Sequence, residues 1–391
     1  MGNESLSGKT VVARLDLNSN VENSELFPGA RIREHAKTLK QLSEKGAKVV
    51  ALAHQGRKGE EGCISLQQHA EEISEQVEKE VKLLKWDSDY IAAIKEMQNG
   101  DIVLMENVRF HDNEEQEFTP EEASKIEWVQ KIASAADIFV QDSLSVCHRA
   151  QPSVIGFSGL PSFAGPVLER ELKALEHYDS AGKPAVFIFG GAKVKDSIKA
   201  LQAVLENGKA DFACAAGLVG ELFLKAKGIR LGEKEKVFEE KGLNELLGSA
   251  KQILEAHPEK LVLPQDVAVL DEDDERLEIA VEELPSDFLV CDVGMETVSL
   301  FRKHVLKAKL VVFNGPLGMF EKYGFEVATR KLLSEISKAK AYSLIGGGDT
   351  VDAVEELDFS FKDFSHVSLG GKALMQYISG KELPGLLALS K

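Results

Sequence analysis

Short apolar runs rich in β-branched residues alternate with longer amphipathic stretches along the whole chain of 391 residues. The runs 48–54 (KVVALAH) and 184–190 (PAVFIFG) are almost continuously apolar, as strands are when both faces of a parallel sheet are covered. Residues 31–45 repeat apolar side chains at steps of three and four, which is the spacing of an amphipathic helix. Strands that alternate with helices pair in parallel through crossover connections. The pattern therefore predicts an α/β fold with doubly wound parallel sheets.

Ten runs fit a buried strand. They cover residues 10–16, 48–54, 101–105, 137–142, 184–190, 211–216, 260–264, 287–292, 309–314 and 341–346. The chain is longer than the roughly 250–300 residues at which a single core stops growing, so we expect two Rossmann-like domains, 1–165 and 180–379. The stretch 166–179 has a helical apolar pattern with a proline at its start. It fits a rigid hinge helix between the domains, and an ordinary surface helix of one domain fits equally well.

Acidic residues outnumber basic ones, with 64 Asp and Glu against 47 Lys and Arg, which gives a formal net charge of −17. This charge opposes binding to nucleic acid and to anionic membranes, so an anionic substrate would need a local basic pocket. The four cysteines have no metal-binding spacing and the first residues have no signal-peptide pattern. We therefore expect a cytoplasmic protein with reduced thiols that acts on small molecules.

Polar and basic side chains follow the predicted strands of the N-terminal half, at the edge where parallel sheets bind ligands. They are Asp16, Asn18, His54, Arg57, Glu106, Arg109, Asp142, His148 and Arg149, and Arg31 opens the first predicted helix. Arginine binds carboxylate and phosphate oxygens through paired hydrogen bonds. The convergence of four arginines on one edge predicts an anion-binding rim. The alternative is that these are solvated loop residues.

Glycines follow the predicted strands of the C-terminal half. The segments are 190–193 (GGAK), 216–218, 292–294, 314–316 and 346–350 (GGGDT), all expected at one sheet edge. Glycine lets backbone N–H groups approach a phosphate chain closely, and helix N-termini favour phosphate. Asp349 has two readings, as the N-cap of the helix that follows it or as a carboxylate that meets nucleotide-bound Mg²⁺. Neither a Walker A motif nor GxGxxG occurs in the chain.

An anion rim in one half and a glycine-lined nucleotide rim in the other predict phosphoryl transfer between an acidic metabolite and a nucleotide. No Ser/His/Asp set, HExxH motif or cysteine nucleophile competes with this reading. Six other histidines lie in helical, polar or charged stretches, and we interpret them as structural or solvated. They are His35, His69, His111, His177, His257 and His304.

Ordered motifs over nearly the full length resemble those of phosphoglycerate kinases, and of their archaeal branch in particular. In the N-terminal half they are RLDLN (14–18), ARIREH (30–35), HQGR (54–57), ENVRF (106–110) and QDSLSVCHRA (141–150). In the C-terminal half they are GGAKVKDSI (190–198), DVGMET (292–297), FNGPLGMFE (313–321), GGGDT (346–350) and HVSLGG (366–371).

The resemblance implies reversible, direct in-line phosphoryl transfer between ATP and 3-phosphoglycerate on hinge closure, with Mg²⁺, in glycolysis and gluconeogenesis. It assigns phosphoglycerate binding to Asp16, Asn18, Arg31, His54, Arg57, Arg109 and Arg149, and catalysis to Arg31, Lys193, Gly370 and Gly371. It assigns nucleotide binding to Gly190, Gly191, Lys193, Gly217, Leu218, Asn314, Pro316, Glu321, Gly346, Gly347, Gly348, Asp349 and Thr350, with Asp349 at the metal. Residues 380–391 would return to the N-terminal domain. A monomer is the family expectation, with self-association open.

Seven positions depart from the family pattern that the resemblance implies. They are Lys58, Ser197, where a second lysine is common, Ala216, Met295, Glu296, Leu369 and Lys372. They bear on the rate of transfer rather than on the fold. The alternative function is therefore a ligand-binding or regulatory module of the same fold with weak or no kinase activity, and an acyl-phosphate or sugar kinase is a third reading.

Overall fold

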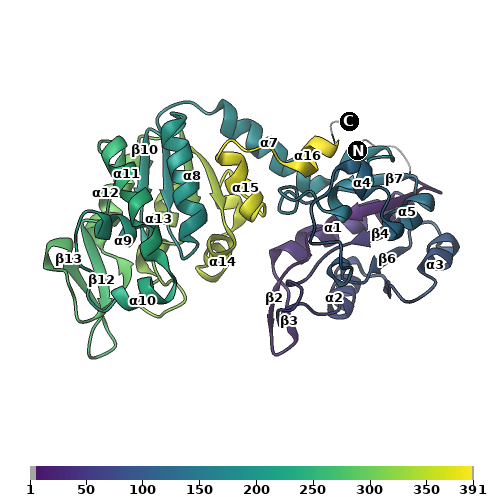
Figure 1. Ribbon diagram of the computed structural model, residues 1–391, viewed down its shortest axis with the longest axis horizontal. Coiled ribbons are helices and arrows are strands. Elements are labelled where there is room, and N and C mark those ends of the chain that lie inside the picture. Colours follow the sequence, from purple (N-terminus) through teal and green to yellow (C-terminus); the bar gives the residue numbers. More distant parts are fainter. Residues whose placement is uncertain (1–5, 390–391) are drawn as a thin grey trace. The chain divides into compact units, whose positions relative to one another are not determined.

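The computed structural model describes residues 6–389; residues 1–5 and 390–391, the outer ends of the predicted N-terminal domain and its C-terminal tail, lie outside the described residues. The chain divides into two compact units (Figure 1). Unit 1 runs up to Leu172 and takes in the segment from Glu382 onward, and unit 2 is Lys173–Lys381. The division falls within helix α7 (Pro166–Ser180).

Unit 1 is built on a six-stranded parallel sheet with the order β5-β6-β4-β1-β7-β8. The strands are β1 (Thr10–Arg14), β4 (Lys48–Leu52), β5 (Val81–Leu84), β6 (Ile102–Met105), β7 (Ile138–Gln141) and β8 (Ser162–Ala164). A short antiparallel hairpin, β2 (Asn20–Glu22) with β3 (Glu25–Phe27), follows β1. The helices are α1 (Ala30–Glu44), α2 (Gln67–Val77), α3 (Tyr90–Glu96), η1 (Val108–Phe110), α4 (Pro120–Ala123), α5 (Glu127–Ser134), α6 (Pro152–Ile155) and α16 (Pro384–Leu389).

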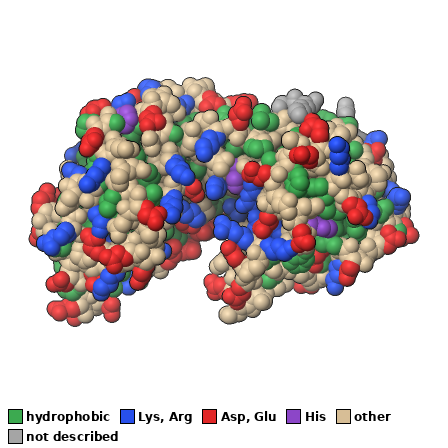
Figure 2. Space-filling model, viewed as in Figure 1, with side chains coloured by type: hydrophobic (Ala, Val, Ile, Leu, Met, Phe, Trp, Pro, Cys, Tyr) green, Lys and Arg blue, Asp and Glu red, His purple; other side chains and the backbone are tan. Residues whose placement is uncertain are grey.

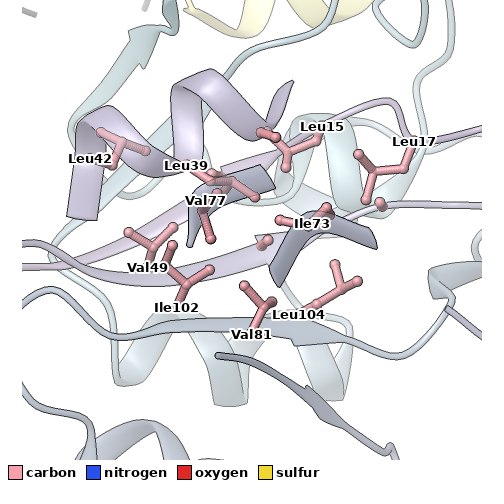
Figure 3. Packing of buried hydrophobic residues seen from close by; sticks show 14 of the residues in the cluster. Leu15, Leu17, Leu39, Leu42, Val49, Ile73, Val77, Val81, Ile102 and Leu104 are labelled. Carbon is pink, nitrogen blue, oxygen red and sulfur yellow. The ribbon is translucent and has the colours of Figure 1, made fainter. Parts of the chain in front are cut away.

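Alternate residues of the central strands of unit 1 enter two separate cores. Val11 and Val49 belong to one buried cluster with Leu39 of α1 and Ile73 of α2. Figure 3 shows Val49, Leu39 and Ile73 in this cluster. Val12 packs on the opposite face, in a cluster that includes side chains of α3 and α5. Because successive side chains of a strand point to opposite faces, both faces of the sheet are covered by helices. This arrangement explains why the strands read as continuous apolar runs.

Unit 2 contains a second six-stranded parallel sheet with the order β11-β10-β9-β15-β16-β17. Its strands are β9 (Ala185–Phe189), β10 (Phe212–Ala215), β11 (Leu261–Val262), β15 (Leu310–Asn314), β16 (Tyr342–Gly346) and β17 (His366–Val367). The longer helices are α8 (Val194–Glu206), α9 (Gly217–Ala226), α11 (Leu247–Ala256), α12 (Met295–Val305), α13 (Val327–Ser337), α14 (Gly348–Glu356) and α15 (Gly371–Ile378). The short ones are α10 (Glu235–Glu240), η2 (Leu243–Leu246), η3 (Val281–Glu283) and η4 (Phe361–Asp363). The predicted fold class, α/β with two doubly wound parallel sheets, is confirmed.

One predicted strand belongs to a different sheet. Residues 287–292 give β14 (Leu289–Val293), which pairs antiparallel with β12 (Asp266–Leu270), and β12 pairs antiparallel with β13 (Arg276–Ala280). The prediction that residues 292–294 lie at the edge of the parallel sheet is therefore wrong. An apolar run specifies burial but not its partner, and here a neighbouring hairpin that the sequence reading missed supplies the partner.

Helix α7 is held at both ends by polar contacts. At its start, the Val167 N–H donates to the Asp142 carboxylate at 2.8 Å. At its end, the Lys209 ammonium donates to the carbonyl oxygens of Tyr178 at 2.6 Å and Asp179 at 3.1 Å. A carboxylate at the N-terminus and an ammonium at the C-terminus both complement the helix dipole. The connecting segment is thus one continuous helix with capped ends.

Candidate functional site

The first turn of α1 brings Arg31 to the end of β1. Its Nε lies 3.3 Å from Oδ2 of Asp16, and its NH1 donates to the carbonyl oxygen of Asn18 at 3.2 Å. Asp16 is buried and also accepts hydrogen bonds from Ser145 and from the Asn18 N–H at 3.0 Å. Burial alone would raise the pKa of Asp16, but the Arg31 guanidinium and these hydrogen bonds lower it well below its usual range. Asp16 is therefore an ionised anchor that orients Arg31.

The loop after β4 places His54 and Gly56 beside the same strand end. The Asn18 side-chain oxygen accepts from the Gly56 N–H at 2.9 Å, which ties the two loops together. His54 is buried, and its pKa lies well below its usual value because burial and the nearby cations Arg14, Arg109 and Arg149 outweigh the attraction of Asp16. His54 is thus a neutral imidazole at pH 7.

Arg109 and Arg149 are guanidinium groups with hydrogen-bonding capacity left over. Arg109 is buried, and its Nε lies 3.4 Å from Glu115 in an ion pair but has no hydrogen-bond partner. Arg149 donates through Nε to His148 at 3.2 Å, while its buried NH1 has no partner. Burial lowers the pKa of both, and the charge of Arg109 lowers that of Arg149 further. Buried donors of this kind favour an anionic ligand.

Arg57 differs from the other predicted rim residues because it is exposed. Its side chain is 72% exposed and forms a 3.5 Å ion pair with Glu60. Its charge nevertheless lowers the pKa of Arg109 and Arg149, so it lies close enough to add to the same positive field. The structure therefore brings all seven predicted phosphoglycerate-binding residues to one edge of the unit 1 sheet.

Two other polar residues of this edge support the loops. The Glu106 carboxylate accepts from Ser65 at 2.7 Å and from the Leu66 N–H at 2.9 Å. The Asn107 side chain donates to the carbonyl oxygens of Gln55 at 2.8 Å and Ile64 at 2.9 Å. Because these groups already bond neighbouring loop residues, they shape the rim rather than extend it to a ligand.

Asp142 and His35 form a buried pair in unit 1. His35 Nδ1 lies 2.9 Å from Asp142 Oδ2, and both side chains are almost completely inaccessible. Asp142 also accepts a hydrogen bond from the Val167 N–H in the first turn of α7. The interpretation of His35 as structural agrees with this placement, and Asp142 joins α1 to the start of α7.

The sequence reading missed Arg14, Ser153 and Glu114, which lie behind the rim. Arg14 is fully buried at the end of β1, donates from Nε to Ser153 Oγ at 2.8 Å and contacts His54 Nδ1 at 3.3 Å. Ser153 Oγ donates to Glu114 at 2.5 Å. Burial lowers the pKa of Arg14 to about 10 and raises that of Glu114 to about 7. The available signal was an arginine inside an otherwise apolar strand, a residue type that is rarely buried without a partner.

In unit 2 the glycine turns pack against one another. The Gly191 N–H donates to the Pro316 carbonyl at 2.7 Å, and the Gly315 N–H donates to Thr350 Oγ1 at 2.7 Å. A Cβ at Gly190 would lie 2.2 Å from the Pro316 carbonyl oxygen. These glycines are therefore required for close approach of the turns, and Thr350 is a buried acceptor that joins two of them.

Lys193 and Asp349 meet across these turns, with 2.7 Å between Nζ and Oδ1. Helix α14 begins at Gly348 with Gly347 as its N-cap and no side-chain cap. The reading of Asp349 as the N-cap is therefore wrong, because Asp349 lies inside the first turn and pairs with Lys193. Both side chains are partly exposed, at 68% for Lys193 and 39% for Asp349.

The other predicted nucleotide residues surround the same turns. Asn314 is buried at the end of β15, and its Oδ1 has no hydrogen-bond partner. Leu218 is buried in the first turn of α9, and Glu321 is exposed in the loop after β15. Gly346 ends β16, and Gly217 and Gly347 both have positive φ angles, which suit glycine.

Four of the positions that depart from the family pattern lie in different environments. Ser197 is buried on α8, and Ala216 is buried as the N-cap of α9. Gly370 is the N-cap of α15 and Gly371 its first residue, so Lys372 lies in the first turn with an exposed side chain, directly after Leu369-Gly370-Gly371.

The described residues 6–389 contain no helix that is long and apolar enough to cross a bilayer, nor any group of three His, Cys, Asp or Glu side chains that could hold a metal ion. All four cysteines are free thiols. Figure 2 shows acidic side chains spread over the visible surface of both units rather than gathered in one patch. The negative charge thus belongs to the body of the protein, while the arginine rim is a local positive site.

Two features together indicate a phosphotransferase. One α/β unit has an arginine rim, and the other has glycine turns with a lysine and a carboxylate. The comparisons with known proteins agree. The profile described as "Phosphoglycerate kinase" matches residues 1–381. The phosphoglycerate kinase of Methanothermobacter thermautotrophicus is 36% identical over 99% of this chain and 95% of that protein. That of Natronomonas pharaonis is 38% identical over 98% of this chain and 97% of that protein.

Solved structures give the same result. The crystal structure of phosphoglycerate kinase from Pyrococcus horikoshii OT3 matches with a TM-score of 0.93 and 33% identity, covering 99% of this chain and 97% of that one. The structure of the Coxiella burnetii phosphoglycerate kinase matches with a TM-score of 0.80 and 33% identity, covering 100% of this chain and 98% of that one. The chain belongs to the phosphoglycerate kinase family and is a kinase. The resemblance seen in its motifs is confirmed.

Proposed function

We propose that this protein catalyses reversible phosphoryl transfer between Mg²⁺-ATP and 3-phosphoglycerate, giving ADP and 1,3-bisphosphoglycerate in glycolysis and gluconeogenesis. The observation that carries the proposal is the incomplete hydrogen bonding of the rim: Arg109 Nε and Arg149 NH1 are buried donors with no hydrogen-bond partner. A buried donor left unsatisfied costs about 1–3 kcal/mol, more when it is charged. An anion with several oxygens, such as a phosphate ester, satisfies such donors.

Unit 1 corresponds to the proposed phosphoglycerate domain, which we expect to span residues 1–165 with the tail 380–391. Arg57, Arg109 and Arg149 would bind the phosphate group, and Asp16, Asn18 and His54 would fix the three-carbon acid. Arg31 is held by Asp16 at 3.3 Å and retains donors for the transferring group. The positive rim on an acidic body would concentrate a small polyanion.

Unit 2 corresponds to the proposed nucleotide domain, which we expect to span residues 180–379. The close-packed turns at Gly190, Gly217, Asn314 and Gly347 would present backbone groups to the nucleotide, with Glu321 at the ribose. Mg²⁺ enters with the nucleotide as part of the substrate. A single carboxylate, Asp349, fits this cation because Mg²⁺ commonly takes one or two carboxylates and completes its shell with phosphate oxygens and water.

Transfer of the phosphoryl group requires in-line positioning and neutralisation of charge rather than a covalent intermediate. Lys193, released from Asp349 as the Mg²⁺-nucleotide binds, would join Arg31 and the N-terminus of α15 at Gly370 and Gly371 around the transferring group. Closure about α7 would bring the two ligands together and exclude water, which limits hydrolysis of ATP. We place the protein in the cytoplasm as a monomer.

The alternative, a ligand-binding module with weak or no transfer, is tested by one assay. Wild-type protein is given ATP, Mg²⁺ and 3-phosphoglycerate, and formation of 1,3-bisphosphoglycerate is followed by a coupled reaction. Arg31→Ala should lower kcat by about 100-fold or more, as loss of a transition-state charge contact does. Arg33→Ala, at an exposed position of the same helix, serves as the matched control and should retain wild-type turnover. Wild-type turnover no faster than that of Arg31→Ala would refute the enzyme reading.

A further inference from the structure

The Arg14 guanidinium is buried, and each of its three nitrogens contacts a neighbouring residue. Its Nε donates to Ser153 Oγ at 2.8 Å, and its NH1 donates to the carbonyl oxygens of Leu15 and, at 3.4 Å, of Leu52. Its NH2 lies 3.3 Å from Nδ1 of His54. No part of Arg14 reaches solvent, so this residue acts on a ligand only through its neighbours.

The contact with His54 has only one chemically possible direction. A guanidinium has five N–H donors and no acceptor, so the Arg14 NH2 must donate and His54 Nδ1 must accept. An imidazole nitrogen accepts only when it carries no proton. The proton of the neutral His54 ring is therefore on Nε2, which makes that nitrogen a donor.

The other side of Arg14 is anchored by a hydrogen-bond chain that runs in one direction. Ser153 Oγ accepts from Arg14 and donates to Glu114 Oε1 at 2.5 Å, while the Ser153 N–H donates to Glu114 Oε2 at 3.1 Å. Glu114 and Ser153 are both buried. The guanidinium plane is thereby fixed, and with it the position of the donor that faces His54.

We propose that Arg14, anchored by Ser153 and Glu114, is a positioning residue that holds His54 as the neutral tautomer with its proton on Nε2. The proposal rests on the proposed function, in which His54 contacts phosphoglycerate. Its consequence is that His54 gives the substrate a hydrogen-bond donor and neither a base nor a positive charge. The substrate atom that meets His54 is then an acceptor oxygen, and the charge of the anion is balanced by the arginines alone.

The charged groups around His54 act in opposite directions on its protonation. Asp16, at the end of β1, favours the imidazolium, whereas Arg14, Arg109 on η1 and Arg149 in the loop after β7 oppose it. Removal of Arg14 therefore takes away both an opposing cation and the donor that occupies Nδ1. We expect His54 to move toward the imidazolium or toward a mixture of tautomers.

Nitrogen NMR of the full-length protein with labelled histidines measures the tautomer without reference to activity. The His54 signals are identified by their loss in His54→Gln. We expect wild-type His54 to be neutral at pH 7 with the proton on Nε2, and Arg14→Met to change this pattern. A wild-type proton on Nδ1, or an unchanged spectrum in Arg14→Met, would overturn the proposal. If Arg14→Met does not fold, Ser153→Ala removes only the anchor and should change the His54 signals in the same direction.

A double-mutant cycle measures the effect on the substrate. Arg14→Lys should raise the KM for 3-phosphoglycerate about 10-fold, comparable to one hydrogen bond to a charged ligand, with a much smaller change in kcat. In a His54→Gln background the same substitution should raise KM little further. Equal effects in both backgrounds would show that Arg14 acts independently of His54, against the proposal. A wild-type protein without turnover would refute the proposed function, whereas the tautomer result would still decide the role of Arg14.

Discussion

Asp16→Asn tests whether the rim is held by its ionised carboxylate. The substitution keeps the shape of the side chain and one oxygen for the Asn18 N–H, but it removes the charge that faces Arg31 at 3.3 Å. Loss of one partner of a buried ion pair costs about 3–5 kcal/mol. Because the Arg31 side chain is 26% exposed and partly screened by solvent, we expect a smaller loss in the free energy of unfolding of unit 1, about 2 kcal/mol.

Tryptophan fluorescence measures this loss in unit 1 alone. The protein has two tryptophans, and both, Trp86 and Trp128, lie in unit 1 with their ring centroids 5.5 Å apart. With a urea dependence of about 2 kcal/mol per molar, a loss of about 2 kcal/mol lowers the midpoint of the fluorescence transition by about 1 M. The matched control is Asp112→Asn, whose carboxylate is exposed and pairs only at the surface with Lys58. It should leave the midpoint unchanged.

The effect of Asp16 should also depend on pH. Its pKa in the folded protein lies well below the unfolded value of about 3.9. A carboxyl group with a depressed folded pKa stabilises the fold above the unfolded pKa, and this contribution is lost as the pH falls toward the folded value. The difference in midpoint between wild type and Asp16→Asn should therefore be full at pH 7 and shrink below about pH 4. Equal midpoints at pH 7 would refute the reasoning, because Asp16 would then contribute nothing through its charge.

Two further predictions concern unit 2. Asp349→Asn removes the carboxylate that pairs with Lys193 at 2.7 Å. We expect kcat to fall and the Mg²⁺ concentration needed for half-maximal rate to rise when Mg²⁺ is titrated at fixed ATP. An unchanged Mg²⁺ dependence would contradict the assignment of Asp349 to the metal. Thr350→Val removes the acceptor of the Gly315 N–H at 2.7 Å, which should cost about 1–3 kcal/mol in thermal unfolding followed by circular dichroism and raise the KM for ATP with little change in that for 3-phosphoglycerate.

Much of the fold could be predicted because burial on both faces of a parallel sheet leaves a strong pattern in the sequence. In β1, for example, the neighbouring residues Val11 and Val12 are both apolar because they enter the cores on opposite faces of the sheet. The partner of β14 could not be predicted, because an apolar strand pairs equally well in either sheet and its choice depends on the hairpin β12–β13. Short edge strands such as β8, with three residues, give too few positions to show a period.

The placement of candidate site residues was predictable where polar residues closely follow a strand, as for Asp16 after β1 and Arg109 after β6. The sequence did not predict residues that would act on a ligand only through a neighbouring side chain. Arg14 stands in an apolar run and contacts Ser153 across 139 positions of sequence. Likewise the pairing of Lys193 with Asp349 joins positions 156 residues apart. Local sequence patterns describe single elements, whereas such contacts depend on how the elements pack.

The arginine rim combines two demands that ordinarily conflict. Guanidinium groups must be buried to form directed contacts with a small anion, yet a buried charge without a partner is unfavourable. The structure gives three arginines at or behind the rim a partial partner: Asp16 for Arg31, Glu115 for Arg109 and, through Ser153, Glu114 for Arg14. The donors that remain unfilled, on Arg109 and Arg149, are then those that a ligand can satisfy. A net charge of −17 is therefore compatible with an anionic substrate. Some of the acidic residues hold the arginines of the rim in place, and the rim itself remains a local positive site.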